Sequence, residues 1–296
     1  MIDRIIPEKS DNMLAIADPA AENISYGGNQ AWFTGNTQAY AGCGPVAAVN
    51  MLLCLMQKYP EPIKELLAKA GLSASSSNSF CPPFLKDDIL HLMNEIYLTM
   101  GTLEIPVLNR LYDRSDRKNP LFKVLSPNHG RSIPGFCRGI LKYAGNHGIF
   151  LHADVLPTAF CPYETGLRFI KEGLEKSGSV VLLTSFNRHP LTLFKETSEG
   201  TMVPYEHKGG MCCHFAVITD IMAETAPVLK LSTWGKAAAV EYRLLAASWQ
   251  SRRAFDSALF YFTPAKTSDI TAQDMKQAYR VLLQALWQTL FKKIRT

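Results

Sequence analysis

Two residues of this sequence could together form a nucleophile and its base. Cys43 comes directly before Gly44 and Pro45, and the apolar spacing that follows predicts a buried helix over 44–59. A cysteine attacks carbonyl groups as the thiolate, and its ordinary pKa of about 8.5 leaves little thiolate at neutral pH. A helix N-terminus or a nearby imidazolium favours the thiolate. Cys43 is therefore either an activated thiol or a small buried residue at a helix start.

Of the seven histidines, His214 is best placed to supply the imidazolium, because it opens a strongly strand-like segment. A further group should orient its ring. Asp220 is six strand residues away, about 20 Å, which is too far. In the next strand-like segment, Ser232 and Trp234 are two residues apart and therefore share a face. We expect the Ser232 hydroxyl to meet the imidazole and the Trp234 indole to cover both.

Three short motifs occur in a meaningful order along the chain. They are Gln38 followed by Cys43-Gly44-Pro45, then His214-Phe215-Ala216-Val217, then Ser232-Thr233-Trp234-Gly235. This pattern resembles the papain-like cysteine peptidase superfamily, and it looks closest to the bacterial branch that includes the bacteriocin-processing, double-glycine peptidases. The resemblance covers residues 30–60 and 165–245.

The resemblance implies a papain-like fold and a role for each matched residue. Cys43 would be the nucleophile and His214 the general base and acid. Gln38 would donate to the oxyanion beside the Cys43 backbone N–H. Gly44 and Trp234 would line or shield the site.

Two positions depart from the superfamily pattern. Gln38 is five residues before Cys43, one fewer than is usual in the superfamily. Ser232 stands where the superfamily has asparagine, and its hydroxyl is shorter than an amide. Activity could therefore be reduced, the orienting group could come from elsewhere, or the site could be inactive.

The function expected is that of a cysteine peptidase-like hydrolase, which cleaves a peptide, amide or thioester bond through an acyl-enzyme and needs no metal or cofactor. The alternatives are an acyltransferase with the same Cys-His pair, and a catalytically silent binding or scaffold protein. His207, Cys212, Cys213 and His214 cluster in sequence, but their spacing fits no paired zinc-ligand pattern.

Periodicity and turn residues predict an α+β fold, with helices first and an antiparallel sheet afterwards. Residues 1–35 carry many turn residues and are expected to be loop-rich. Further helices are expected over 61–70, 85–100, 133–145 and 165–176. Strands are expected over 148–155, 179–186, 214–221, 228–235 and 238–245, the last three forming a meander.

We expect one papain-like domain over 1–296, with 72–135 as an insertion and 271–296 as a C-terminal helix. That amphipathic helix is expected to pack on the core rather than bind a membrane or a partner.

The bulk composition excludes several classes of function. The net charge is +5 without a basic stripe, which argues against nucleic-acid binding. No run of about 18 apolar residues occurs, so no membrane span is expected. The first residues lack the apolar region of a signal peptide, and the seven cysteines are irregularly spaced. We therefore expect a cytoplasmic protein with reduced thiols.

Overall fold

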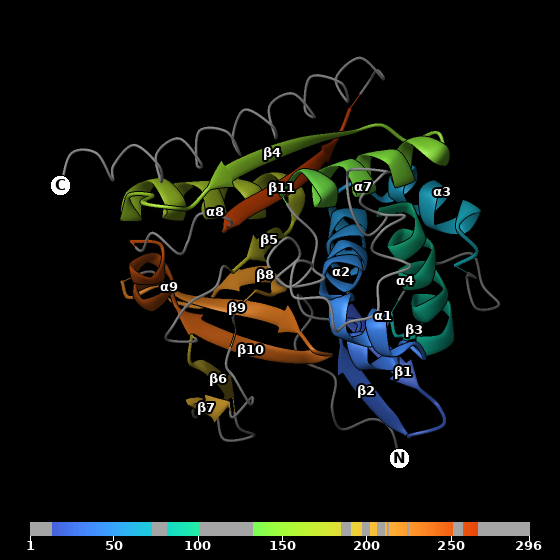
Figure 1. Ribbon diagram of the computed structural model, residues 1–296, viewed down its shortest axis with the longest axis horizontal. Helices are drawn as coiled ribbons and strands as arrows, with labels where there is room; N and C mark the ends of the chain where they lie inside the picture. Colours follow the sequence, from blue (N-terminus) through green and yellow to red (C-terminus); the bar gives the residue numbers. More distant parts are fainter. Residues whose placement is uncertain are drawn as a thin grey trace, which may run out of the picture.

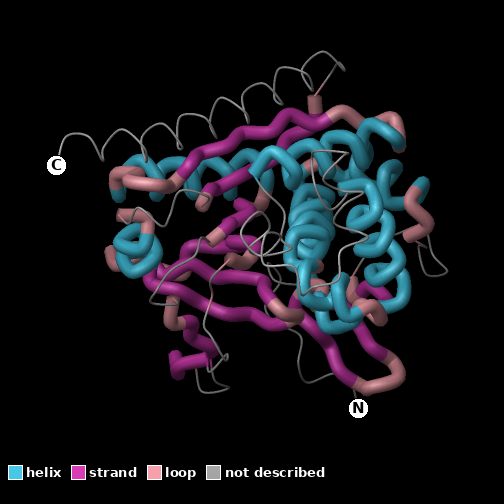
Figure 2. The backbone as a smooth tube through the Cα atoms, viewed as in Figure 1, coloured by secondary structure: helices cyan, strands magenta, loops and turns pink. Residues whose placement is uncertain are grey.

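The computed structural model describes residues 14–72, 82–100, 133–184, 191–196, 202–205, 211, 213–223, 225–250 and 257–265. In this part of the chain, helices pack on a large antiparallel sheet (Figures 1 and 2). The predicted α+β class is confirmed. The greater part of the predicted insertion, 73–81 and 101–132, and the predicted helix 271–296 lie outside the described residues.

The large sheet has eight strands in the order β4-β11-β5-β8-β9-β10-β6-β7, with every neighbouring pair antiparallel. Its strands are β4 (Leu151–Pro157), β5 (Val180–Leu183), β6 (Leu193–Glu196), β7 (Met202–Tyr205), β8 (Phe215–Ile221), β9 (Val228–Thr233), β10 (Lys236–Glu241) and β11 (Ala258–Pro264). The predicted meander is confirmed as β8, β9 and β10. Its last strand is shorter than predicted, because a helix begins at Tyr242.

The helices predicted within the described residues are present with small shifts at their ends. The helices of the described residues are α1 (Asn36–Ala41), α2 (Cys43–Lys58), α3 (Pro60–Lys69), α4 (Lys86–Met100), α7 (Ile133–Asn146), α8 (Tyr163–Ser177) and α9 (Tyr242–Ser248), with a 3-10 turn η2 (Gln30–Trp32). None of them is long and apolar enough to cross a bilayer.

The expectation of a loop-rich N-terminal region was only partly correct. A small sheet forms there in the order β2-β1-β3, with β1 at Ala15–Asp18, β2 at Asn23–Tyr26 and β3 at Phe84–Leu85. β1 and β2 are antiparallel, whereas β3, just before α4, joins β1 in parallel. The strands are too short for a clear period-2 pattern, which is why the sequence did not reveal them.

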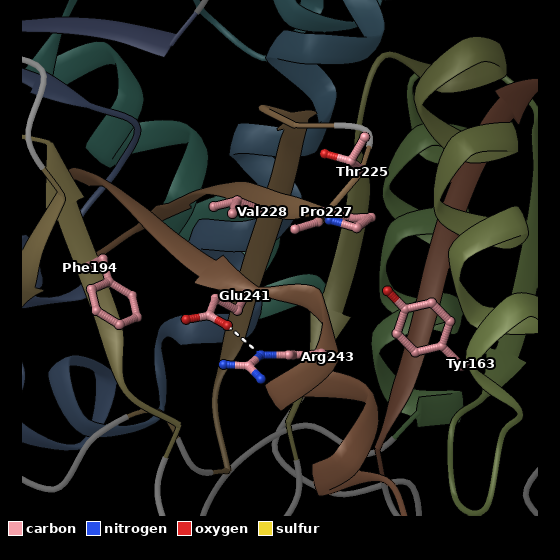
Figure 3. Close-up of a pocket in the computed structure, with 8 residues that line it drawn as sticks. Tyr163, Phe194, Thr225, Pro227, Val228, Glu241 and Arg243 are labelled. Atoms are coloured by element: carbon pink, nitrogen blue, oxygen red, sulfur yellow. Dashed lines mark hydrogen bonds and ion pairs between the residues drawn. The ribbon is translucent and has the colours of Figure 1, made fainter.

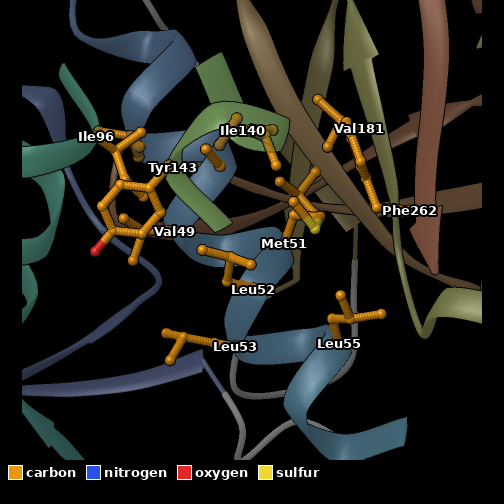
Figure 4. Close-up of a cluster of buried hydrophobic side chains, with 14 of the residues drawn as sticks. Val49, Met51, Leu52, Leu53, Leu55, Ile96, Ile140, Tyr143, Val181 and Phe262 are labelled. Atoms are coloured by element: carbon orange, nitrogen blue, oxygen red, sulfur yellow. The ribbon is translucent and has the colours of Figure 1, made fainter. Parts of the chain in front are cut away.

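The central strands of the large sheet are buried on both faces, as their alternating side chains show. On β5, Val181 and Leu183 pack with α2, α4 and α7, whereas Val180 and Leu182 pack with α8 and α9. Figure 4 shows part of the first cluster, to which Met51 and Leu55 of α2 and Val181 of β5 belong. The near-continuous apolar run predicted as a central strand is thus explained by burial on both sides.

The packing of α7 against α4 can be tested by comparing two glycines of α7, Gly139 and Gly145. A methyl group on Gly139 of α7 would lie 3.0 Å from the Met100 Cα and closer still to its Cγ, whereas one on Gly145 would meet nothing within 4 Å. Gly139→Ala is therefore expected to lower the free energy of unfolding by about 1–3 kcal/mol. Gly145→Ala should raise it by about 0.5–1 kcal/mol, because alanine favours the helix. Urea denaturation of both variants measures the contrast, and equal effects would contradict the close crossing.

Candidate active site

Cys43 is the first residue of α2, as the sequence predicted for the nucleophile. Gly42 separates α1 from α2, and a Cβ there would lie 2.5 Å from the Gln38 carbonyl oxygen, so the tight connection requires glycine. No side chain caps the start of α2. A helix N-terminus favours negative charge, so the start of α2 favours a thiolate at Cys43. The Cys43 side chain is only 6% exposed, and Gly44 beside it is buried too.

His214, directly before β8, is 7% exposed and held on two sides. Its Nε2 lies 2.7 Å from the Thr233 Oγ1. Its ring stacks on the Trp234 indole, with 4.3 Å between centroids and 20° between planes. The predicted cover of the imidazole by Trp234 is present in this stack.

The backbone of His214 is fixed from the neighbouring strand. Its N–H donates to the Thr184 hydroxyl at 3.2 Å, and its carbonyl accepts from the Thr184 backbone N–H at 2.9 Å. Cys213 and Trp234, which flank the His214–Thr233 contact, have φ values of 47° and 50°. Such values strain bulky residues and persist only where the surroundings enforce them. The imidazole is therefore tightly constrained.

The start of α2 and His214 lie at the same end of the sheet. The Asn50 Nδ2 on α2 donates to the Ser232 Oγ at 3.0 Å, and Ser232 pairs with Val217 on β8. Cys43 is seven helical residues before Asn50, about 10 Å. His214 is three strand residues before Val217, also about 10 Å.

The displacement from Asn50 to Cys43 along α2 and the displacement from Val217 to His214 along β8 have the same direction. The other end of α2 lies against the start of β5, because a Cβ on Gly178 would contact the Cys54 carbonyl. That start of β5 pairs with Ile218 of β8, so α2 begins toward the His214 end. Figure 1 agrees, since the arrowhead of β9 points toward the region where α1 and α2 meet.

The hydroxyl that contacts the imidazole differs from the one expected from the sequence. Thr233, and not Ser232, contacts the imidazole, whereas the Ser232 hydroxyl donates to the Tyr26 carbonyl at 2.9 Å and accepts from Asn50. The prediction assumed that strand alternation continues to Trp234. β9 ends at Thr233 and Trp234 is left-handed, so the alternation stops there.

Gln38 lies on α1, and its side chain is directed at α4. Its Nε2 donates to the Asn94 Oδ1 at 3.4 Å, which is a long hydrogen bond. Asn94 in turn donates to the Leu90 carbonyl at 3.0 Å. One amide hydrogen of Gln38 is thus engaged outside the His214 group. Gln38 is one residue closer to Cys43 than in the superfamily pattern, and its side chain lies against α4.

A pocket of about 400 Å³ opens far from these residues (Figure 3). It lies beside Val228, at the opposite end of β9 from Thr233, which places it about 16 Å away along the strand. Tyr163 and Phe194 form its aromatic walls, and the Arg243 Nε donates to the Glu241 Oε2 at 2.6 Å. The pocket contains none of the residues predicted to act in catalysis.

Within the described residues, no group of three His, Cys, Asp or Glu side chains is arranged to hold a metal ion. His207 and Cys212, from the cluster weighed as a zinc site, lie outside those residues. The sequence matches no model of a known protein family and no curated protein.

Proposed function

We propose that this protein is a papain-like thiol hydrolase that cleaves an amide or thioester bond, most simply a peptide bond. The observation that carries the proposal is the buried His214, held between Thr233 and Trp234 at the end of the sheet where α2 begins with Cys43. A cysteine at an uncapped helix start and a constrained imidazole are the two devices that favour a thiolate.

The proposed reaction has two steps. His214 takes the Cys43 proton, and the thiolate attacks the substrate carbonyl. The Cys43 backbone N–H and the second amide hydrogen of Gln38 stabilise the oxyanion. His214 then protonates the leaving amine or thiol, which leaves an acyl-enzyme. Water, deprotonated by His214, hydrolyses the thioester and restores the thiol. The cytoplasm fits this chemistry, since the nucleophile must stay reduced.

A panel of electrophilic peptide and thioester probes tests the proposal. Wild type should form a covalent adduct on Cys43, and Cys43→Ala should form none. Cys161→Ala is a matched control, because Cys161 is a buried thiol packed on the other face of the sheet and should not affect labelling. Mass spectrometry of proteolytic peptides locates the adduct. Equal labelling of wild type and Cys43→Ala would contradict the proposal.

A catalytically silent papain-like binding protein is the second candidate. The burial of Cys43 favours it, as does the open pocket at the far end of β9. This candidate predicts that the same probes leave Cys43 unmodified while the protein remains folded. The acyltransferase alternative predicts an adduct that is released faster by an added amine than by water.

A further inference from the structure

Ser232 and Thr233 are adjacent at the end of β9, but their hydroxyls serve different partners. Ser232 pairs with Val217, whose side chain belongs to the core under α2, so Ser232 faces α2. Its neighbour Leu231 belongs to the core on the other face. Successive strand residues point to opposite faces, so Thr233 points away from α2. At the end of β9 its hydroxyl contacts the His214 ring.

The Ser232 hydroxyl joins three segments through one accepted and one donated hydrogen bond. It accepts from the Asn50 Nδ2 on α2 and donates to the Tyr26 carbonyl at the end of β2. The Asn50 Oδ1 accepts from the Gly28 N–H at 2.9 Å, and Asn50 and Ser232 are each only 1% exposed. Tyr26 also donates its N–H to the Gly235 carbonyl at 2.9 Å, just beyond β9. This network fixes α2 along β9, and α2 carries Cys43.

The Thr233 Oγ1 lies 2.7 Å from the Nε2 of the imidazole. A hydroxyl can accept from a ring N–H as well as donate. If the Nε2–H donates to Thr233, the neutral ring carries its basic lone pair on Nδ1. The ring nitrogen that takes the thiol proton is then defined.

We propose that Thr233 is the positioning residue for His214, that it accepts a hydrogen bond from the ring Nε2–H, and that Ser232 instead positions the helix that carries Cys43. The catalytic part of this assignment rests on the proposed thiol hydrolase function. The two neighbouring hydroxyls thereby position both members of the Cys-His pair. Thr233 positions the base, and Ser232 positions the nucleophile through Asn50.

The hydrogen bond itself is tested without any substrate. Long-range ¹H–¹⁵N spectra of the full-length ¹⁵N-labelled protein report the tautomer of each histidine, and His214→Ala identifies the His214 signals. Wild type, Thr233→Ser and Ser232→Ala should show the Nε2–H tautomer above pH 8, whereas Thr233→Val should show a mixture of tautomers. An Nδ1–H tautomer in wild type, or no change in Thr233→Val, would overturn the assignment.

The link to catalysis is tested by the pH dependence of Cys43 alkylation with iodoacetamide. In Thr233→Val the imidazolium loses an acceptor, so the pH range of rapid alkylation should narrow, and alkylation at pH 6 should slow about tenfold. Thr233→Ser should restore the wild-type profile. Ser232→Ala should lower the melting temperature while leaving the limits of this range in place.

The two proposals can fail separately. Slow alkylation of Cys43 in wild type, with the Nε2–H tautomer present, overturns the thiol hydrolase and supports the hydrogen bond to Thr233. Rapid alkylation whose pH limits move in Ser232→Ala but not in Thr233→Val overturns the division of roles and supports the hydrolase.

Discussion

At pH 6, iodoacetamide is expected to modify Cys43 about tenfold faster than an ordinary free thiol, and to leave Cys54 and Cys161 unmodified. An ordinary thiol is ionised to roughly 0.3% at pH 6, so full ionisation raises the reactive fraction about 300-fold. The weaker nucleophilicity of a low-pKa thiolate offsets roughly 30-fold of this gain. Timed quenching followed by peptide mapping gives the rate for each cysteine.

The buried thiols provide internal controls in the same molecule. Burial raises the pKa of Cys54 to about 12, and burial also raises the pKa of Cys161. Both thiols therefore stay protonated at neutral pH, and because they are as buried as Cys43 they report the reactivity of a buried thiol without activation. An alkylation rate for Cys43 that is as low as theirs would show that burial, and not activation, determines its chemistry.

The dependence on pH separates an activated thiolate from an exposed thiol. Between pH 6 and pH 8 the alkylation rate of an ordinary thiol should rise about 75-fold as its thiolate forms, whereas the rate of Cys43 paired with His214 should change little. His214→Ala should convert the Cys43 profile to the ordinary one. His91→Ala is the control, because the His91 side chain is 57% exposed on α4 and its Nε2 lies 3.6 Å from the Glu95 Oε1 on the same helix. Steep dependence in wild type would exclude the ion pair.

The positions of Cys43 and His214 in the fold could be predicted because local pattern determines both. The start of α2 follows from the Gly-Pro after Cys43 and the helical spacing beyond it. β8 follows from its β-branched, apolar residues, and short connections make β9 and β10 its neighbours. These are the longest and most regular elements near the site.

The stack of Trp234 on the imidazole was predicted, but the hydroxyl that contacts the ring was not, because it depends on where a strand stops. A one-residue difference at the end of β9 exchanges Ser232 for Thr233 at His214. Asn50 gave a usable signal, since it is a polar residue in the middle of an apolar helix and such residues are buried only with partners. Its partner 182 residues away in sequence could not be found without the register of α2 on the sheet.

The strands of the sheet margin were missed for a related reason. β6 and β7 have four residues each, and the second includes Pro204, which weakens any strand prediction. β11 is different, because it lies inside the sheet between β4 and β5 and its apolar, aromatic run Ala258–Pro264 is typical of a strand, although none was predicted there. The segment 242–245 was assigned to a strand from its apolar residues, whereas its leucine and alanine content also suits the helix α9 that forms.

Gly27→Ala is expected to destabilise the protein by about 2–5 kcal/mol, because Gly27 lies inside the network that joins α2 to β9. Its φ is 83°, a conformation that costs alanine about 1–2 kcal/mol. A Cβ at Gly27 would also lie 2.6 Å from the Asn50 Nδ2 and closer still to the Ser232 Oγ. Overpacking of this kind typically adds about 1–3 kcal/mol. Urea denaturation gives the free energy of unfolding.

Gly148→Ala separates the two contributions. Gly148 has a φ of 78°, but a Cβ there would meet only the flexible end of Lys69 at 3.7 Å. Its substitution should therefore cost only the conformational part, about 1–2 kcal/mol. A cost of Gly27→Ala no larger than that of Gly148→Ala would mean that Asn50 and Ser232 move aside freely.

The combination of Gly27→Ala with Ser232→Ala extends the test to the network itself. Ser232→Ala leaves the buried Asn50 amide and the Tyr26 carbonyl with one partner fewer, which should cost about 1–3 kcal/mol. It also removes the Ser232 Oγ, with which the methyl group introduced by Gly27→Ala would clash. The double variant should therefore be more stable than the sum of the single changes predicts. Additive effects would instead show that Gly27 and Ser232 contribute independently to stability. The connection from β2 through β9 to the helix of Cys43 would then not be rigid.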